Sequence, residues 1–175
     1  RYLAGYDCVY TFRDNYYLSE CLPIFYRTDL YELINFKTFW LSDTPEEMSN
    51  TWQGYYFRIC TYAVLKEKAT NKCFVVANTH LDYKTNEIKL KSVKLINQKL
   101  NALSLPTIVM GDFNSTQQNN AIKEMKNYYS DAGTDFEDVN QSTNFSNNKL
   151  KKIDYIFQKG FDVINYNVIT TTFNG

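Results

Sequence analysis

Apolar and polar residues alternate along the middle of the chain in a way that predicts a β-hairpin. Over residues 55–66, Phe57 and every second residue as far as Leu65 fall on one face, and the residues between them fall on the other. Asn71 and Lys72 form a predicted turn, and the apolar run 73–79 predicts a second strand. The two segments are therefore expected to be antiparallel partners.

The spacing of apolar residues changes to a helical period after this hairpin. Val93, Ile96, Leu100 and Leu103 are three or four residues apart, which predicts a helix over residues 87–103. The lysines of this segment are expected on its solvated face: Lys89, Lys91, Lys94 and Lys99.

Shorter segments complete the pattern. Further strands are predicted over residues 8–12, 23–27, 107–110, 153–157 and 161–169. A short helix is predicted from a cap at Asn119 or Asn120 to about Tyr128. Residues 30–40 carry scattered apolar residues without an assigned element, and the polar segments 41–45 and 135–150 predict loops. Because strands outnumber helices, the pattern predicts an α/β sandwich with a mostly antiparallel or mixed sheet.

Composition limits what the protein can be. A length of 175 residues predicts a single domain over residues 1–175. The 19 basic and 19 acidic residues balance, so bulk charge gives no support for nucleic-acid or membrane binding. No apolar run reaches about 18 residues, so no transmembrane helix is predicted, and no feature indicates a cellular compartment. The single histidine, His80, excludes a site that takes two histidines from this chain.

The cysteines leave two alternatives open. They show no C-x-x-C spacing, and either two disulfides or buried free thiols would fit Cys8, Cys21, Cys60 and Cys73.

Two polar segments follow predicted strands and could carry chemistry. His80 lies in N-T-H-L-D, where a neutral imidazole could accept a proton and a charged one could bind a phosphate oxygen. Asp112 and Asn114 lie in G-D-F-N and, two residues apart, would point the same way in an extended segment. This pair places a carboxylate that can orient water or bind Mg²⁺ beside an amide that can donate to a phosphoryl oxygen. A structural histidine and an ordinary turn are the simpler interpretations.

A third segment, I-D-Y-I-F, places Asp154 between apolar residues inside a predicted strand. An acid buried there is costly unless it is paired, and a usual partner is Nδ1 of a histidine. The simpler interpretation is an edge-strand carboxylate that faces water.

Together and in this order, N-T-H-L-D, G-D-F-N and I-D-Y-I-F resemble the motifs of the endonuclease/exonuclease/phosphatase superfamily. The segments P-I-F-Y-R, F-W-L-S-D-T-P and R-I-C-T-Y-A are similar to a hydrolase branch of it, and the resemblance covers residues 23–175. It implies a four-layer α/β sandwich of two packed mixed sheets flanked by helices. It also implies hydrolysis of a phosphoester that depends on Mg²⁺ or Mn²⁺.

The resemblance implies a role for each motif residue. Asp112 matches the carboxylate that orients or deprotonates the attacking water, and with Asn114 it is a weak candidate metal ligand. Asn114 and His80 match groups that contact the phosphoryl oxygens, and Asp154 matches the acid that orients a second histidine. Arg58 stands where some members place a phosphate-contacting arginine, although a structural salt bridge fits equally. His80, Asp112, Asn114 and Asp154 are expected to converge at one rim of the sandwich.

Two elements of the family pattern have no match. Nothing before Pro23 matches the strand with an Asn or the segment with the principal metal-binding Glu, since Glu20 lacks the expected strand and helix. No second histidine follows Asp154. The sandwich is therefore expected to be incomplete at both ends, and the chain to be a fragment of a hydrolase that is inactive alone. The alternatives are a degenerate, non-catalytic member that binds a protein partner, and an unrelated α/β domain.

The substrate stays open at this stage. DNA, RNA, a nucleotide, a phospholipid or an inositol phosphate would each fit a phosphoester hydrolase. Zero net charge argues mildly against a long nucleic-acid footprint, because such a footprint needs many phosphate contacts from basic residues.

Overall fold

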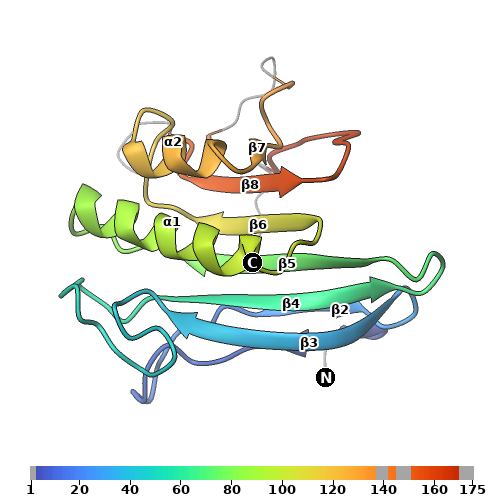
Figure 1. The fold of residues 1–175 in the computed structure, drawn as a ribbon, viewed down its shortest axis with the longest axis horizontal. Coiled ribbons are helices and arrows are strands. Elements are labelled where there is room, and N and C mark those ends of the chain that lie inside the picture. The colour runs from blue at the N-terminus through green and yellow to red at the C-terminus, as the bar shows by residue number, and fades with distance from the viewer. Residues whose placement is uncertain (1–2, 137–141, 145–150, 170–175) are drawn as a thin grey trace, which may run out of the picture.

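A six-stranded sheet organises the chain, with two helices on one face and a two-stranded sheet on the other (Figure 1). The computed structural model describes residues 3–136, 142–144 and 151–169. The predicted α/β sandwich is confirmed, and the described residues form three of its layers.

The six-stranded sheet is mixed. Its strand order is β3-β4-β5-β6-β8-β7, in which β5 and β6 run parallel and the other neighbours run antiparallel. In that order the strands span Tyr31–Trp40, Ile59–Glu67, Cys73–His80, Thr107–Asp112, Asp154–Lys159 and Ser130–Asp131. The small antiparallel sheet pairs β1 (Tyr6–Val9) with β2 (Ile24–Arg27).

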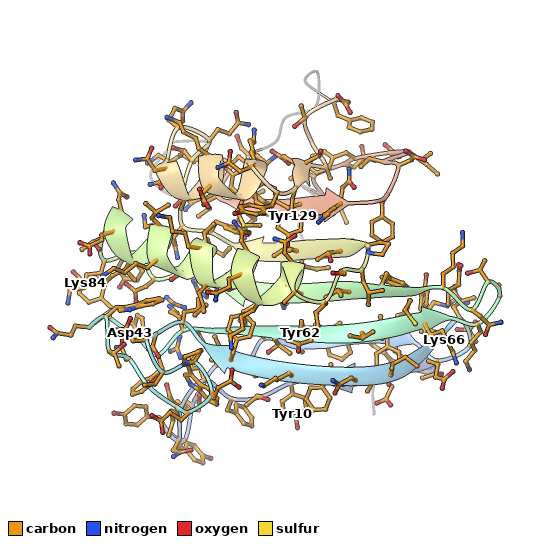
Figure 2. The ribbon with its side chains drawn as sticks, viewed as in Figure 1. Tyr10, Asp43, Tyr62, Lys66, Lys84 and Tyr129 are labelled. Carbon is orange, nitrogen blue, oxygen red and sulfur yellow. The ribbon has the colours of Figure 1, made fainter. Side chains whose placement is uncertain are left out.

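Strand β4 carries apolar residues on both of its faces, and each face is covered by a different layer. Ala63 and Leu65 point into the core that β1 and β2 close. Cys60 is buried in the core under the helices, and Tyr62 and Val64 pack against that core; Figure 2 labels Tyr62 on this strand. The alternation of the sequence is therefore confirmed, and both of its faces are apolar because each covers a separate core.

Helix α1 (Asn86–Asn101) begins at an N-cap, Thr85, whose hydroxyl accepts a hydrogen bond from the Ile88 N–H at 3.2 Å. Its apolar stripe is buried as predicted, with Val93, Ile96 and Leu100 at most 1% exposed. This stripe holds the helix on the sheet.

Helix α2 (Asn120–Lys126) is shorter than predicted. Of the two candidate caps, Asn119 is the one used, and its side chain accepts a hydrogen bond from the Ala121 N–H at 2.9 Å. Tyr129 lies beyond its end and is 4% exposed in the core under the helices (Figure 2).

Two strand predictions near the chain ends need correction. No strand forms over residues 161–169, where Ile164 is 95% exposed. Gly160, with φ of 84°, turns the chain at the end of β8, and the apolar residues beyond it find no strand partner in the described segments. The predicted strand 8–12 ends at Val9, and Phe12 makes an isolated bridge with Cys21.

The structure also adds two strands, β3 and the two-residue β7, and settles an alternative. Residues 31–40 form the edge strand β3, which the scattered apolar pattern did not reveal because pairing with β4 decides it. The four cysteines are free thiols. The predicted loop 135–150 falls mostly outside the described residues. Within the described part of the chain, neither helix has the length and apolarity that crossing a bilayer requires.

Glu46 joins the edge strand to a helix and provides a test of surface electrostatics. Its carboxylate pairs with Lys37 of β3 and Lys99 of α1, and these partners lower the pKa of Glu46 to about 2, Lys37 most strongly. Because the side chain is 52% exposed, we expect Glu46→Gln to lower the free energy of unfolding at pH 7 by no more than about 1 kcal/mol.

The pH dependence of this effect has a definite sign. The depressed pKa stabilises the folded state fully above the ordinary value of 4.5, and this contribution is lost as the pH falls towards 2. Urea unfolding of the wild type and of Glu46→Gln should therefore give free energies that converge as the pH is lowered. The exposed neighbour Glu47, changed to Gln, is the control. A constant difference down to the lowest pH at which the protein folds would contradict this assignment.

Candidate active site

Three of the predicted site residues form a row across neighbouring strands. His80 ends β5, Asp112 ends β6 and Asp154 begins β8, and the strand register makes them direct partners. Partners opposite each other in a sheet present their side chains on the same face. The row lies at the left edge of the sheet in Figure 1, where the arrowhead of β6 meets the start of β8. His80 Nε2 lies 3.6 Å from Asp112 Oδ2.

A glycine allows β6 to reach this row. Gly111 has φ of 141°, and a Cβ there would lie 1.8 Å from the Thr79 carbonyl oxygen of β5. Glycine is thus the residue that this close approach of two strands requires. The backbone that follows it carries Asp112 into the row.

Asn114 is held beside the row by a compact turn. Its φ is 45°, and its N–H donates to Asp112 Oδ1 at 2.7 Å. The Asn114 amide group donates to the Leu81 carbonyl at 2.9 Å, and the Lys89 ammonium donates to the Asn114 carbonyl at 2.8 Å. Lys89 is therefore buried, 8% exposed, and its predicted place on a solvated face is wrong. Helical spacing alone does not show that a lysine of the first turn points at a neighbouring loop.

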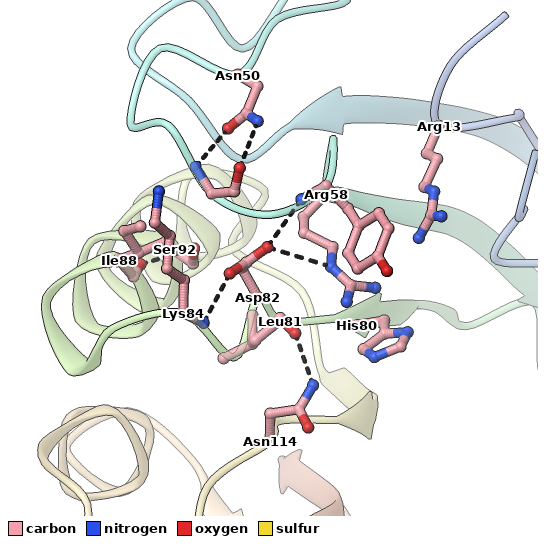
Figure 3. A network of polar contacts seen from close by, with 12 residues as sticks. Arg13, Asn50, Arg58, His80, Leu81, Asp82, Lys84, Ile88, Ser92 and Asn114 are labelled. Carbon is pink, nitrogen blue, oxygen red and sulfur yellow. Dashed lines mark hydrogen bonds and ion pairs between the residues drawn. The ribbon is translucent and has the colours of Figure 1, made fainter. Parts of the chain in front are cut away.

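Arg58 lies near the same edge and is 6% exposed. Its Nε is 3.8 Å from Asp82 Oδ2, and Asp82 also accepts hydrogen bonds from the N–H groups of Tyr56 and Lys84 at 3.1 and 2.8 Å (Figure 3). Asp82, 1% exposed, thus ties the loop before β4 to the loop after β5. The structural salt bridge considered for Arg58 is present, and it uses the Nε side of the guanidinium, so that the Nη groups face the row.

Sequence reasoning missed two residues of this site. Asp82 belongs to N-T-H-L-D, and its place two residues after His80 is the signal in the sequence that could indicate a role for it. Glu20 was set aside because it lacks a strand and helix around it. The bridge between Phe12 and Cys21 brings Glu20 to the row, with its carboxylate 3.6 Å from Arg58 Nη1 and 3.9 Å from His80 Nδ1.

Burial sets the electrostatics of the row. It raises the pKa of Asp112, an effect that the Asn114 N–H and His80 oppose and the charge of Asp154 reinforces. Burial, together with the nearby Arg58, lowers the pKa of His80. The row therefore holds a carboxylate that is more basic than usual beside an imidazole that favours its neutral form. A carboxylate with a raised pKa is a stronger base than an ordinary one and is therefore better suited to accept a proton from water.

Asp154 is positioned through its backbone. The N–H groups of Asp154 and Ile153 each donate to the Thr143 hydroxyl at 3.1 Å, which fixes the start of β8. The four predicted residues are thus brought together at one edge, with Arg58 beside them.

The oxygen atoms at this edge suit a hard divalent cation. The carboxylates of Asp112 and Asp154 lie on adjacent strands, and the Asn114 amide group uses one N–H on the Leu81 carbonyl, which leaves its oxygen for a cation and its second N–H for an anion. The described residues contain no group of three or more His, Cys, Asp or Glu side chains arranged to hold a metal. A cation at Asp112, Asp154 and the Asn114 oxygen would have at most two carboxylates as ligands. Mg²⁺ accepts such a site, because it binds through one or two carboxylates and keeps several waters.

Comparisons with known proteins identify the family and the fold. The model of a family described as the endonuclease/exonuclease/phosphatase family matches residues 9–173. A solved protein of that family from Bacteroides thetaiotaomicron is 31% identical, with a TM-score of 0.78 over 88% of this chain and 60% of the other. A mannosyl-6-phosphatase from the same species is 30% identical, with a TM-score of 0.79 over 90% of this chain and 64% of the other.

The catalytic domain of human Nocturnin shares the fold, with a TM-score of 0.70 at 18% identity over 88% of this chain and 60% of that one. The chain therefore spans about three fifths of the length of these solved proteins. No curated protein sequence matches it.

Proposed function

The chain belongs to the endonuclease/exonuclease/phosphatase family, and from this premise we propose that it catalyses the Mg²⁺-dependent hydrolysis of a phosphoester. The row of His80, Asp112 and Asp154 carries the proposal, because it gathers two carboxylates and an imidazole at one edge of the sheet, with His80 Nε2 at 3.6 Å from Asp112 Oδ2. The mannosyl-6-phosphatase relative supports a phosphoester as the substrate class.

Each residue has a chemical task in this reaction. Asp112 orients the water that attacks phosphorus and accepts its proton, while the P–O bond to the leaving alcohol breaks and the leaving oxygen takes a proton from solvent. Asp154 places a negative charge beside Asp112 and so favours the protonated form that this transfer produces. His80, Asn114 and Arg58 donate hydrogen bonds to the non-bridging oxygens as negative charge builds on them.

Asp112 and Asn114 would hold Mg²⁺ through a carboxylate and an amide oxygen, with Asp154 on the adjacent strand. When bound, the cation supplies Lewis-acid stabilisation of the phosphoryl oxygens. The small number of acidic ligands in the described residues favours the second candidate function, a non-catalytic family member that binds a partner.

A metal-dependence experiment separates the two functions. The full-length protein, freed of metal with EDTA, should hydrolyse phosphoesters when Mg²⁺ or Mn²⁺ is added and should lose this activity again with excess chelator. The panel contains a hexose phosphate, a nucleotide, an inositol phosphate, a phospholipid and short DNA and RNA. Released phosphate or cleaved product is measured for each.

The outcomes are distinct. Activity that survives chelation would contradict the metal dependence but leave a hydrolase. No hydrolysis of any substrate in the presence of Mg²⁺ and Mn²⁺ would favour the non-catalytic alternative.

A further inference from the structure

A second arginine, Arg13, lies beside the predicted site, although the sequence analysis did not predict it as a site residue. Its backbone is fixed on both sides, because its carbonyl accepts a hydrogen bond from Trp40 Nε1 at 2.7 Å and its N–H donates to the Glu20 carbonyl at 3.0 Å. Its side chain is 12% exposed. The loop before β2 thus holds this guanidinium in a defined place (Figure 3).

Arg13 and Arg58 are brought together by one aromatic ring. The two guanidinium carbons lie 4.7 and 5.1 Å from the centroid of Tyr56. Two like charges side by side repel each other, and stacking on an aromatic ring offsets only part of this cost. The pair therefore attracts an anion.

Buried carboxylates orient both guanidinium groups. Arg13 Nε is 3.4 Å from Asp14 Oδ2, and Arg58 Nε is 3.8 Å from Asp82 Oδ2. Both Nε atoms are buried without a hydrogen-bond partner, so these contacts are ion pairs that steer the groups without satisfying them. The Nη ends of both arginines consequently point to the same place.

That place is occupied by an exposed carboxylate. Glu20, 56% exposed, reaches Nη1 of Arg13 and lies 3.6 Å from Nη1 of Arg58. The cavity of about 10 Å³ that Arg13, Glu20, Arg58 and His80 help to line has room for about one water. A larger anion would therefore bind at the mouth, where it competes with Glu20 for the same Nη donors.

We propose that Arg13 and Arg58 form a two-arginine clamp for the phosphate of a phosphomonoester, so that the site selects monoesters over diesters. The inference rests on the proposed function and names its substrate class. A monoester carries about 1.5–2 negative charges at neutral pH and three terminal oxygens. A diester carries one charge and two free oxygens, so it leaves part of a double arginine site unused.

The test compares two substrates with the same leaving group, p-nitrophenyl phosphate and bis(p-nitrophenyl) phosphate, in the full-length protein. In Arg13→Met, kcat/KM for the monoester should fall roughly 10- to 100-fold, the cost of one lost charged hydrogen-bonding group. The value for the diester should change less than about threefold. Inorganic phosphate should inhibit the variant more weakly, by a factor similar to the loss on the monoester.

Two further variants show whether the effect belongs to the clamp. Arg13→Lys keeps the charge but not the planar fork, so its loss on the monoester should lie between those of the wild type and Arg13→Met. Arg27→Met is the matched control, because Arg27 is an exposed arginine of β2 that pairs with Asp29, and it should behave as wild type. Thermal unfolding checks that every variant is folded.

Each result decides a different question. Equal losses on both substrates with unchanged phosphate inhibition would make Arg13 structural and overturn the clamp. A wild-type preference for the diester would overturn monoester selection and leave the proposed phosphoesterase intact. If neither substrate is hydrolysed, the substrate panel described above tests the proposed function, and calorimetry with inorganic phosphate tests the clamp separately. Binding that is weaker in Arg13→Met would support it, whereas equal binding or none would overturn it.

Discussion

Replacing Asp112 by asparagine should lower kcat for phosphoester hydrolysis in Mg²⁺ by about 10²–10⁴-fold, the contribution of a positioned general base. The amide that replaces the carboxylate cannot accept the proton of the attacking water. The amide keeps an oxygen that can accept the hydrogen bond from the Asn114 N–H. In the wild type this N–H donates to Asp112 Oδ1 at 2.7 Å. The turn that carries Asn114 should therefore survive the change.

Stability separates this effect from misfolding. Burial raises the pKa of Asp112, which means that the charged carboxylate is costly in the folded state at neutral pH. A neutral amide removes this cost, so Asp112→Asn should be at least as stable as the wild type in urea. Asp162→Asn, an exposed carboxylate beyond the other end of β8, is the control and should keep full activity. Unchanged turnover in Asp112→Asn would remove Asp112 from the mechanism.

The largest loss of stability is expected from Gly111→Ala. The added Cβ would lie 1.8 Å from the Thr79 carbonyl oxygen, and φ at this position is 141°. Neither atom can move without breaking the pairing of β5 with β6. We therefore expect the free energy of unfolding to fall by about 3 kcal/mol or more, from backbone strain and overpacking together.

Gly5→Ala separates the two causes. Gly5 also has a positive φ, 80°, but a Cβ there would meet nothing within 4 Å. This variant should lose only the conformational cost, about 1–2 kcal/mol. Urea unfolding of both variants measures the difference, which belongs to the contact with Thr79. Equal losses at the two positions would show that the close approach of the strands contributes nothing.

The sequence predicted those parts of the fold that local patterns determine. The β4–β5 hairpin, the buried stripe of α1 and the strand that carries Asp154 were all visible in apolar spacing. The edge strand β3 was not, because only its pairing with β4 makes it a strand. The predicted strand after Gly160 is wrong for the opposite reason, since its residues find no strand partner in the described part of the chain, although Tyr166 is buried and Phe161 packs against Phe74.

The sequence predicted the residues of the site that belong to motifs, but not those in the loop before β2. The motifs placed His80 and Asp112 after predicted strands and Asp154 inside one, the family resemblance implied that they converge, and the register of the sheet places them in one row. Arg13 and Glu20 lie in a loop that no periodic pattern marks. Their place depends on a bridge between Phe12 and Cys21 and on a hydrogen bond from Trp40, and neither can be read from local sequence.

The row has a consequence for how such a protein can diversify. Its members sit at strand ends whose mutual positions depend on hydrogen bonds inside the sheet and not on the length of the chain between them. Residues can therefore be added to or removed from the connection between β6 and β8, away from Asn114 and Thr143, without moving Asp112 away from Asp154. The sheet therefore sets the positions of the reacting side chains, whereas changes in the loops between its strands can alter which substrate binds.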